Sequence, residues 1–595
     1  MFSPNNNNYS RRRFLSQSGL GLLAFAGMPG LLNAMEGMQA MPKLPPRQAN
    51  PNFKADVEIE LFCKPASVPI FVGQQTRVLQ YSARVLNGPK DAVTEIPGSY
   101  LGPLIHLQKG QKVRIHLHNG LSETTVTHWH GLHVPAEMDG HPLYAIDPGE
   151  KLVYEFEVLN RASMNIYHPH PHEITAKQVY HGLAGALFVH DEEEAALGLP
   201  SGAYEIPIVI QDRLFDDQNQ LVYVRHMHER MMGFYGDRIL VNGRAEFQID
   251  VESRAYRLRI LNGSTARIYK LAWDDGTHIT VIGVDGGLLE KPETKPYMML
   301  APGERLDVWA DFSGRAEGSQ LVMRSLPFSG VLPSMGMMMH RGSLPVGSDY
   351  PVFTVKVTRK VSDSPKLPNT LSSFRRYQIA DTANPNKPVP IGISEAHMAM
   401  LLNGRPYAYN DVQDFERIPV NSIQLMEIFH AHGGGHGQPA AGDGQAAGQQ
   451  GGMGMGMGMG MGMGMGMGMG MGMGMGMGMG MGMGMGGMRH GGMGGGMGGG
   501  MGMGGGMMMS MAHPIHMHGQ SFQIVSRSIA NGMEHDYATV SDGFIDSGLK
   551  DTVLVMPGES VRLIKPFQDF KGLFMYHCHN LEHEDMGMMR DFLVV

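Results

Sequence analysis

Four short segments of the chain carry two histidines two residues apart. In an extended strand the side chains at positions i and i+2 point to the same face, so each segment presents two imidazoles to one place. Imidazole is a good ligand for copper, zinc, iron and nickel. One pair alone is a weak signal, but four pairs predict a metal centre of eight imidazoles: His128 and His130, His168 and His170, His516 and His518, and His577 and His579.

A cysteine lies inside the last pair. On a strand, the sulfur of Cys578 projects to the face opposite His577 and His579, so this short stretch can serve two metal sites at once. Two histidines, one cysteine and a weak axial thioether form a blue-copper electron-transfer site. The sequence offers that set as His513, Cys578, His583 and Met588. An electron arriving at the cysteine would have a covalent path through the backbone to the neighbouring imidazoles.

These segments together resemble the copper motifs of the multicopper oxidases, in particular the bacterial copper-efflux and laccase-like branch. The resemblance implies four copper ions, one of type 1, one of type 2 and two of type 3, and the reduction of O2 to water by four electrons and four protons. It implies that type 1 copper is held by His513, Cys578, His583 and Met588, type 2 copper by His128 and His516, and the type 3 pair by His130, His168, His170, His518, His577 and His579.

Two acidic residues match positions that this family uses to relay protons. Asp139 follows His130 by nine residues, and Glu584 is adjacent to His583. The alternatives are a turn aspartate and a solvated glutamate. The remaining nearby histidines are expected at the surface or behind the ligands: His133, His141, His172 and His181. We also expect His226 and His228 at the surface, and Cys63 as a buried or incidental thiol.

Short strands with turns between them must position these residues. From about Val57 onward, apolar and polar residues alternate in short runs that end at Gly, Pro and Asn, with no long helical periodicity. This pattern predicts an all-β protein, and the resemblance implies three cupredoxin-like Greek-key sandwich or barrel domains. We expect them at residues 46–200, 201–365 and 366–595, with the three-copper cluster where the first and third meet and the second domain structural.

A low-complexity insert at residues 433–509 interrupts the third domain. Residues 453–509 hold about half of the 53 methionines, alternating with glycine. Thioethers prefer Cu(I), and glycine lets them gather round an ion. We therefore expect a disordered segment that binds extra Cu(I), helped by nearby histidines and a second methionine cluster, Met335, Met337, Met338 and Met339. The alternative is a linker without a role. Residues 507–512 contain no aspartate, although the family's substrate-copper site has one shortly before the type 1 histidine.

The first 45 residues resemble a twin-arginine export signal. Ser10 is followed by three arginines and Phe14, and an apolar run extends from Gly19 to Leu32. That run is shorter than the roughly 20 residues of a spanning helix, which disfavours the alternative of a membrane anchor. No later segment is long and apolar enough to span. The mature protein is therefore expected in the periplasm, without a membrane segment.

Composition excludes several other classes of protein. The net charge of −8 and pI near 6.4 give no general attraction for nucleic acid. Two cysteines cannot build a disulfide framework or an iron–sulfur site.

Our first functional hypothesis is a monomeric periplasmic oxidase that takes electrons from Cu(I) and passes them to O2, protecting the cell from cuprous ion. The axial Met588 should keep the type 1 potential moderate, which favours easily oxidised donors. Within the same class, the alternative is a laccase that oxidises small phenols. In a different class, the alternative is a copper-binding or storage protein, but an idle site would not need the complete set of Cys578, His583 and Met588.

Overall fold

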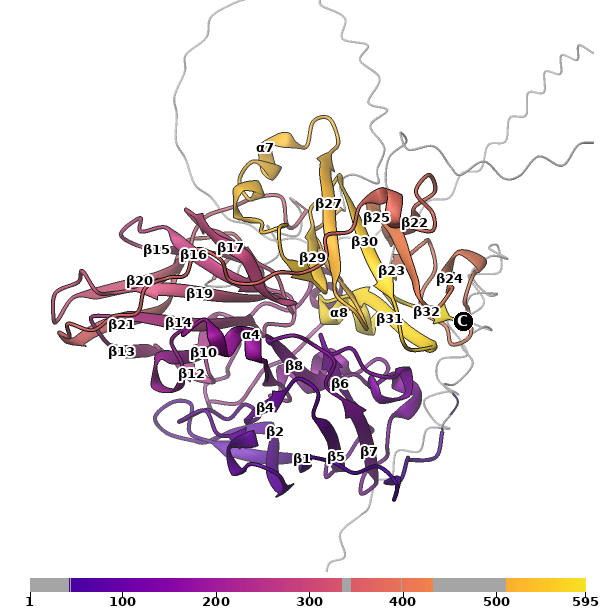
Figure 1. Ribbon diagram of the computed structural model, residues 1–595, viewed down its shortest axis with the longest axis horizontal. Coiled ribbons are helices and arrows are strands. Elements are labelled where there is room, and N and C mark those ends of the chain that lie inside the picture. Colours follow the sequence, from indigo (N-terminus) through magenta and orange to yellow (C-terminus); the bar gives the residue numbers. More distant parts are fainter. Residues whose placement is uncertain (1–41, 43, 334–343, 397–398, 432–509) are drawn as a thin grey trace, which may run out of the picture. The chain divides into compact units, whose positions relative to one another are not determined.

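The computed structural model describes residues 42, 44–333, 344–396, 399–431 and 510–595. The described chain is predominantly β, which confirms the predicted fold class. Its strands form six sheets that fall into three groups along the chain, seen as indigo to purple, magenta, and orange to yellow ribbons in Figure 1. Three predicted features lie wholly or almost wholly outside the described residues: the export signal, the insert at 433–509 and the cluster at Met335–Met339.

The first strand group forms two sheets that enclose one core. One sheet has the order β2-β1-β5-β7 and the other β3-β4-β9-β8-β6. In β5, Val113, Ile115 and Leu117 alternate inward, and they pack with Trp129 and Tyr167 from the second sheet. The strands are β1 (Val57–Val68), β2 (Thr76–Asn87), β3 (Val93–Thr94), β4 (Leu104–Gln108), β5 (Lys112–Asn119), β6 (Thr127–His130), β7 (Lys151–Glu157), β8 (Ser163–Pro169) and β9 (Gly185–His190).

The second group also pairs two sheets, in the orders β12-β11-β10-β14-β19-β16-β17 and β13-β21-β20-β15-β18. Its apolar core contains residues of both, including Leu258 of β14 and Phe353 of β21. The strands are β10 (Glu205–Arg213), β11 (Arg238–Val241), β12 (Arg244–Ala245), β13 (Gln248–Glu252), β14 (Ala255–Asn262), β15 (Tyr269–Trp273), β16 (Ile279–Val284), β17 (Gly287–Lys295), β18 (Met298–Leu300), β19 (Arg305–Asp311), β20 (Gln320–Ser325) and β21 (Tyr350–Arg359).

The third group has the sheet orders β23-β22-β25-β30-β27-β28 and β24-β32-β31-β26-β29. Cys578 and Met588 belong to the core between these two sheets. The strands are β22 (Val389–Ala396), β23 (Ala399–Leu402), β24 (Arg417–Ile418), β25 (Ser422–His430), β26 (His513–Met517), β27 (Phe522–Ile529), β28 (Leu549–Lys550), β29 (Thr552–Val555), β30 (Glu559–Phe567), β31 (Gly572–Cys578) and β32 (Met589–Val594).

Helices are few and short among the described residues, and none of those described is long and apolar enough to cross a membrane. Helix α8 matters for the site because it carries His583 and Glu584. Helix α5 matters because the backbone carbonyl of its Met231 contacts His583. The α-helices are α3 (Thr175–Tyr180), α4 (Glu192–Ala196), α5 (Met227–Met232), α7 (Glu534–Tyr537) and α8 (Leu581–Asp585). The 3-10 helices are η3 (Lys90–Ala92), η4 (Ala136–Met138), η5 (Pro142–Tyr144), η6 (Gly202–Tyr204), η7 (Ile379–Asp381), η8 (Asp414–Glu416) and η9 (Ser541–Gly543).

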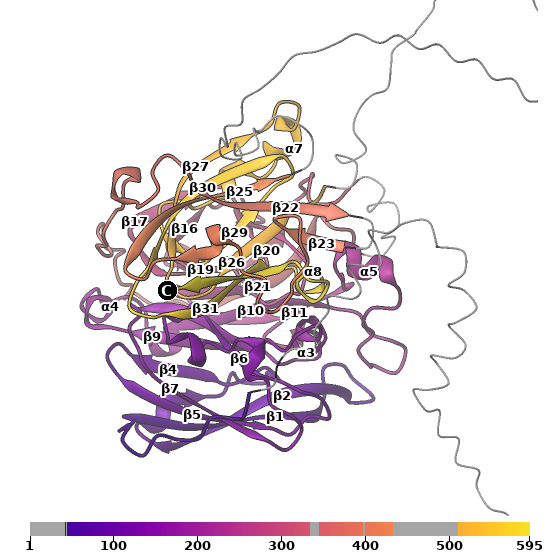
Figure 2. The same ribbon diagram turned by 90° about the vertical axis from the view of Figure 1, so that its right-hand side faces the viewer.

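The predicted domain boundaries near Pro200 and Pro365 lie in the connections between the three strand groups. Division into three independently folding domains stays a prediction. The purple strand β6 lies near the yellow β31 and α8 in both views, and Figure 1 shows β8 next to β6 (Figures 1 and 2). Contacts between His170 and His577 link these segments, so the first and third groups meet where the predicted metal ligands lie.

Candidate metal centre

Strand pairing brings the four histidine pairs together. In the first group β6 runs antiparallel to β8, with His128 opposite His168. In the third group β26 runs antiparallel to β31, with His516 opposite His577. All eight imidazoles of the four pairs are buried. The register therefore gathers two pairs on each side of the boundary between the groups.

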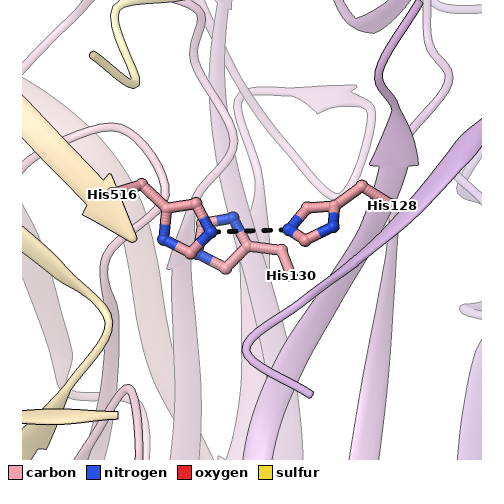
Figure 3. Close-up of side chains that lie close together, drawn as sticks. All are labelled: His128, His130 and His516. Carbon is pink, nitrogen blue, oxygen red and sulfur yellow. Dashed lines mark hydrogen bonds between the residues drawn. The ribbon is translucent and has the colours of Figure 1, made fainter. Parts of the chain in front are cut away.

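One cluster joins the two sides directly. His128 and His130 come from β6 and His516 comes from β26, and their rings lie together in Figure 3. The Nε2 atoms of His128 and His516, which the resemblance assigns to type 2 copper, are 3.4 Å apart. Nitrogens at this separation and pointing toward each other can bind one ion between them.

Two further clusters contain the remaining imidazoles, and His130 belongs to one of them as well as to the first cluster. His130, His168 and His579 form one, and His170, His518 and His577 form the other, each with ligand atoms within 4.8 Å of one another. In the second of these, the Nε2 atom of His577 lies 3.3 Å from that of His170 and 3.2 Å from that of His518. Each trio takes histidines from both strand groups, so both trios lie where the first and third groups meet.

Several of these ring nitrogens are left bare. His130 Nδ1, His168 Nε2 and both nitrogens of His579 are buried and have no hydrogen-bonding partner among the described residues. A buried polar atom without a partner is destabilising by roughly 1–3 kcal/mol. Bare nitrogens that converge in groups of three fit metal ions, and the donor set of imidazoles and one thiolate suits copper.

The opposite ring nitrogens are held by the surrounding protein. The Nδ1 atom of His128 donates to the carbonyl of Asp139 at 2.6 Å, and that of His516 donates to the carbonyl of Asp551 at 2.9 Å. His168 Nδ1 donates to the carbonyl of Pro169 at 2.9 Å. Such bonds fix the tautomer and the orientation of a ligand ring, so these imidazoles are oriented with Nε2 toward the cluster.

Burial keeps these imidazoles neutral. It lowers the pKa of His168 to about 4, although a bond to Pro169 opposes the effect. It also lowers the pKa of His516 to about 4, against the influence of Asp551. A neutral imidazole is the form that binds metal, so protons do not compete for these ligands near neutral pH.

The two predicted proton-relay carboxyl groups lie beside different histidines of these clusters. Asp139 Oδ2 lies 2.6 Å from His518 Nδ1, and Glu584 Oε2 lies 3.1 Å from His577 Nδ1. Burial raises the pKa of Asp139 well above its ordinary value. Burial also tends to raise the pKa of Glu584, but His170 and His577 together reverse the effect, so its pKa is lowered. Two acids with pKa values pushed apart can hold and accept protons in turn.

A third carboxylate, Asp551, was missed by the sequence reasoning. It accepts a hydrogen bond from His130 Nε2 at 3.0 Å and two from Arg305, each at 2.6 Å. Arg305 begins β19 in the second strand group and is fully buried. A carboxylate behind a ligand imidazole orients it and raises its basicity. The second group, expected to be structural, thus holds one ligand in place through Asp551.

The cysteine forms its own cluster on the other face of β31. His513 Nδ1 lies 3.3 Å and His583 Nδ1 lies 3.8 Å from Cys578 Sγ, and all three residues are fully buried. Burial raises the pKa of the Cys578 thiol well above its ordinary value, while the Asn580 N–H, which donates to the sulfur at 3.4 Å, opposes it. Metal binding would therefore displace the thiol proton.

Met588 is placed next to this cluster by the backbone. Its carbonyl accepts from the Cys578 N–H at 3.0 Å and its own N–H donates to the His583 carbonyl at 3.0 Å. The side chain is fully buried in the core that contains Cys578. Its thioether as the axial ligand stays a proposal.

The remaining histidines and Cys63 differ in how deeply they are buried. Of the histidines expected at the surface or behind the ligands, His133 and His141 are buried, and their Nε2 atoms pair with Asp569 at 2.9 Å and Asp591 at 3.1 Å. His172 and His181 are half-buried, and His226 is exposed while His228 is half-buried. Cys63 is a buried free thiol, and it forms no disulfide with Cys578.

Comparisons with known proteins place these features in a family. Two models described as multicopper oxidase match residues 78–194 and 503–595, which include every predicted copper ligand. Multicopper oxidase Mco of Staphylococcus aureus is 27% identical over 492 residues, 83% of this chain and 81% of that protein. The laccase of Bacillus subtilis is 24% identical over 544 residues, 83% of this chain and 88% of that protein.

The fold agrees with a solved structure of the same class. The multicopper oxidase McoA of Aquifex aeolicus aligns with a TM-score of 0.65 at 27% identity, covering 93% of this chain and 100% of that one. The chain belongs to the multicopper oxidase family of copper-binding oxidoreductases. Cell division protein FtsP of Escherichia coli is also similar, 32% identical over 312 residues, 52% of this chain and 62% of that protein. Similarity of fold alone does not determine the reaction, which depends on the residues of the site.

Proposed function

We propose that this protein is an exported oxidase that takes electrons from Cu(I) and reduces O2 to water. The observation that carries the proposal is the single strand end at which Cys578 lies in one cluster while His577 and His579 lie in the others. Bound copper would supply one-electron transfer at the cysteine and four-electron reduction of O2 at the three-copper cluster. The chain's own residues would bind the copper ions, orient the ligand rings and limit which donors reach them.

The ligand assignments follow from the clusters. We assign type 1 copper to His513, Cys578, His583 and Met588. We assign type 2 copper to His128 and His516, and the type 3 pair to two trios: His130, His168 and His579, and His170, His518 and His577. His130 lies near both His516 and His168, but its Nε2 is bonded to Asp551, which leaves Nδ1 for metal.

Protons reach the cluster through the carboxyl groups in this proposal. Asp139, with its raised pKa, holds a proton beside His518, and Glu584, with its lowered pKa, accepts one beside His577. The four-proton reaction needs both a donor and a group that is ready to be reprotonated. The two carboxyl groups lie behind His518 and His577, which belong to the same trio of proposed ligands.

Burial of the type 1 ligands supports a small donor. The side chains of His513 and His583 are 0% exposed, so a bulky phenol cannot reach either ring without displacing the chain around it. Thioethers precede His513 in sequence, from Met453 through Met509 to the buried Met511. Soft sulfur ligands favour Cu(I), and we propose that residues 453–509 bind extra Cu(I) on its way to the type 1 site.

The test is oxygen uptake by copper-loaded protein given Cu(I) or a simple phenol. Three forms are compared: the wild type, a variant lacking residues 453–509, and a variant of full length with serine for each methionine of that segment. We expect fast uptake with Cu(I), slower uptake in both variants, and faster phenol oxidation only in the shortened one. The length-matched variant separates the loss of sulfur ligands from the loss of a covering segment.

Other outcomes select the alternatives. Uptake with phenol alone, unchanged by either variant, would make the protein a broad-specificity phenol oxidase, a reading that the similarity to a laccase favours. No uptake with any donor from fully loaded protein would make it a copper-binding or storage protein. Protein loaded after the substitution Cys578→Ser is the control for copper chemistry outside the assigned site.

We further propose export to the periplasm by the twin-arginine pathway and a monomeric mature protein. The support for export is the sequence around Arg11 and Arg12. Replacing both with lysine should leave unprocessed protein in the cytoplasm, measured by cell fractionation. Unchanged secretion would refute the proposed route, and light scattering of the mature protein tests the monomer.

A further inference from the structure

The ring of His513 is held at both of its nitrogens. Nδ1 faces the sulfur of Cys578 at 3.3 Å, so it is the nitrogen available to a metal. With a metal bound at Nδ1, the proton of the ring resides on Nε2. That nitrogen donates to Glu395 Oε1 at 2.9 Å, and the side chain of Glu395 is only 2% exposed. A carboxyl group thus contacts the proposed type 1 site through one imidazole.

Glu395 occupies a position that the strand pattern reserves for an apolar residue. In β22, Ile391 and Ile393 alternate into the core and are fully buried, and Glu395 continues the same face. Its Oε1 atom also accepts from the backbone N–H of Met511 at 3.1 Å. Two N–H donors on one oxygen favour the ionised form of the carboxyl group. Because a buried carboxylate is destabilising unless it is bonded, a charge at this place is a specific feature.

The other histidine of the cluster is held differently. His583 also directs Nδ1 toward Cys578, at 3.8 Å, and its Nε2 lies 3.0 Å from the backbone carbonyl of Met231 in α5. That partner is a neutral dipole, whereas the partner of His513 is an anion. The two imidazoles therefore have the same orientation toward Cys578, but the hydrogen-bonding partners behind them differ in charge.

We propose that Glu395 is a positioning residue of the type 1 site and that its negative charge lowers the reduction potential of copper bound there. An anion behind a ligand imidazole increases electron donation by that ring and favours the more positive oxidation state of the metal. A lower potential favours donors that give up an electron easily, such as cuprous ion, over refractory phenols. The inference rests on the proposed type 1 assignment.

The test uses two substitutions at Glu395 in copper-loaded full-length protein. Glu395→Gln keeps an oxygen that accepts from His513 Nε2 but removes the charge, and Glu395→Leu removes both. The control is Glu427→Gln on the neighbouring strand β25, where a half-buried carboxylate pairs with Arg562 at 3.3 Å. This control removes the same charge from the same strand group, away from the copper ligands.

The type 1 potential is measured by redox titration of the blue absorption, with copper content and the electron paramagnetic resonance spectrum recorded for each protein. For Glu395→Gln we expect an unchanged spectrum and a potential raised enough to increase the ratio of reduced to oxidised site about tenfold at a fixed ambient potential. Glu395→Leu should raise it as well and also change the spectrum, because the ring is no longer held. Glu427→Gln should match the wild type.

An unshifted or lowered potential in Glu395→Gln would overturn the inference, as would an equal shift in the control. Loss of type 1 copper from Glu395→Gln would make the residue merely structural and would also overturn it. If the wild type has no blue absorption, the type 1 assignment itself fails and the inference with it. A blue wild type with an unshifted Glu395→Gln would refute the inference alone.

Discussion

Lys565 gives the sharpest test of the electrostatics around the histidine clusters. It lies in β30 beside a small cavity of about 10 Å³ that His133, His518 and Gln520 also line. The side chain is buried, and its ammonium donates to the carbonyl of Gln520. Burial lowers the pKa of Lys565 to about 7, and Asp551 and Asp139 only partly oppose this. The folded protein therefore holds this charge at an unfavourable place.

The size of the effect on the free energy of unfolding follows from the difference between the folded and unfolded pKa of Lys565. The unfolded pKa is 10.5 and the folded pKa is about 7, so between these values the unfolded chain binds the proton more readily and stability rises with pH. Below pH 7 the full penalty applies, roughly 5 kcal/mol at 1.36 kcal/mol per unit. Replacing Lys565 by methionine removes this penalty, but the protein also loses about 1 kcal/mol of stability from the hydrogen bond to Gln520. We expect Lys565→Met to stabilise the protein by about 3–4 kcal/mol at pH 6, and not at all by pH 10.5.

Lys550 provides the matched control. It is also buried, but it pairs with Asp285 at 3.0 Å and Glu304 at 3.2 Å, and these partners outweigh burial and raise its pKa. Lys550→Met should therefore destabilise the protein at every pH below 10. The free energy of unfolding of the copper-free variants is measured in urea at pH 6, 8 and 10. A destabilised Lys565→Met, or a stabilisation that does not change with pH, would refute the reasoning.

Three further predictions concern the metal centre. Cys578→Ser should abolish the blue absorption and donor oxidation while the far-ultraviolet circular dichroism is unchanged, and a blue, active variant would refute the type 1 assignment. Copper-free protein should lose stability as the pH falls from 6.5 towards 4, because the unfolded chain protonates its imidazoles first. His168 and His516, with pKa about 4, each contribute up to about 3 kcal/mol of that loss, and urea midpoints at pH 7.5 and 5 should show it. Copper-loaded protein should resist until the metal dissociates, and equal midpoints for the copper-free form would contradict the buried neutral imidazoles. Arg305→Met leaves Asp551 buried without its main partner and should destabilise the fold by about 3–5 kcal/mol, measured by the same titration, whereas a neutral effect would show that the pair is dispensable.

The spacing of the histidines predicted much of the candidate site. Two residues apart on a strand means one face, and the structure places each predicted pair in one buried centre, with Cys578 on the other face beside His513 and His583. The sequence did not contain the register that sets His128 opposite His168 and His516 opposite His577. Pairing between strands distant in sequence is decided by the packing of whole sheets, which a local pattern does not determine.

The residues that the sequence reasoning missed act from outside the histidine motifs. Asp551 and Arg305 are separated by 246 positions and meet only because the second and third strand groups pack together. Glu395 did leave a local signal, since it continues the inward face of Ile391 and Ile393. An acidic residue at an apolar position of a strand is a warning of function that local reading can detect. The burial of His133 and His141 gave no such signal, because each is satisfied by an aspartate far along the chain.

The metal centre belongs to no single strand group, and this has an energetic consequence. His128 and His516 face each other across the boundary, while Asp551 bonds to His130 of the first group and to Arg305 of the second. Without a cation, the bare nitrogens of His168 and His579 make that boundary less stable. Copper bound there would satisfy these nitrogens from both sides at once, so its binding free energy would stabilise the packing of the first and third groups. The same ions that react would then also hold together the surfaces that bind them.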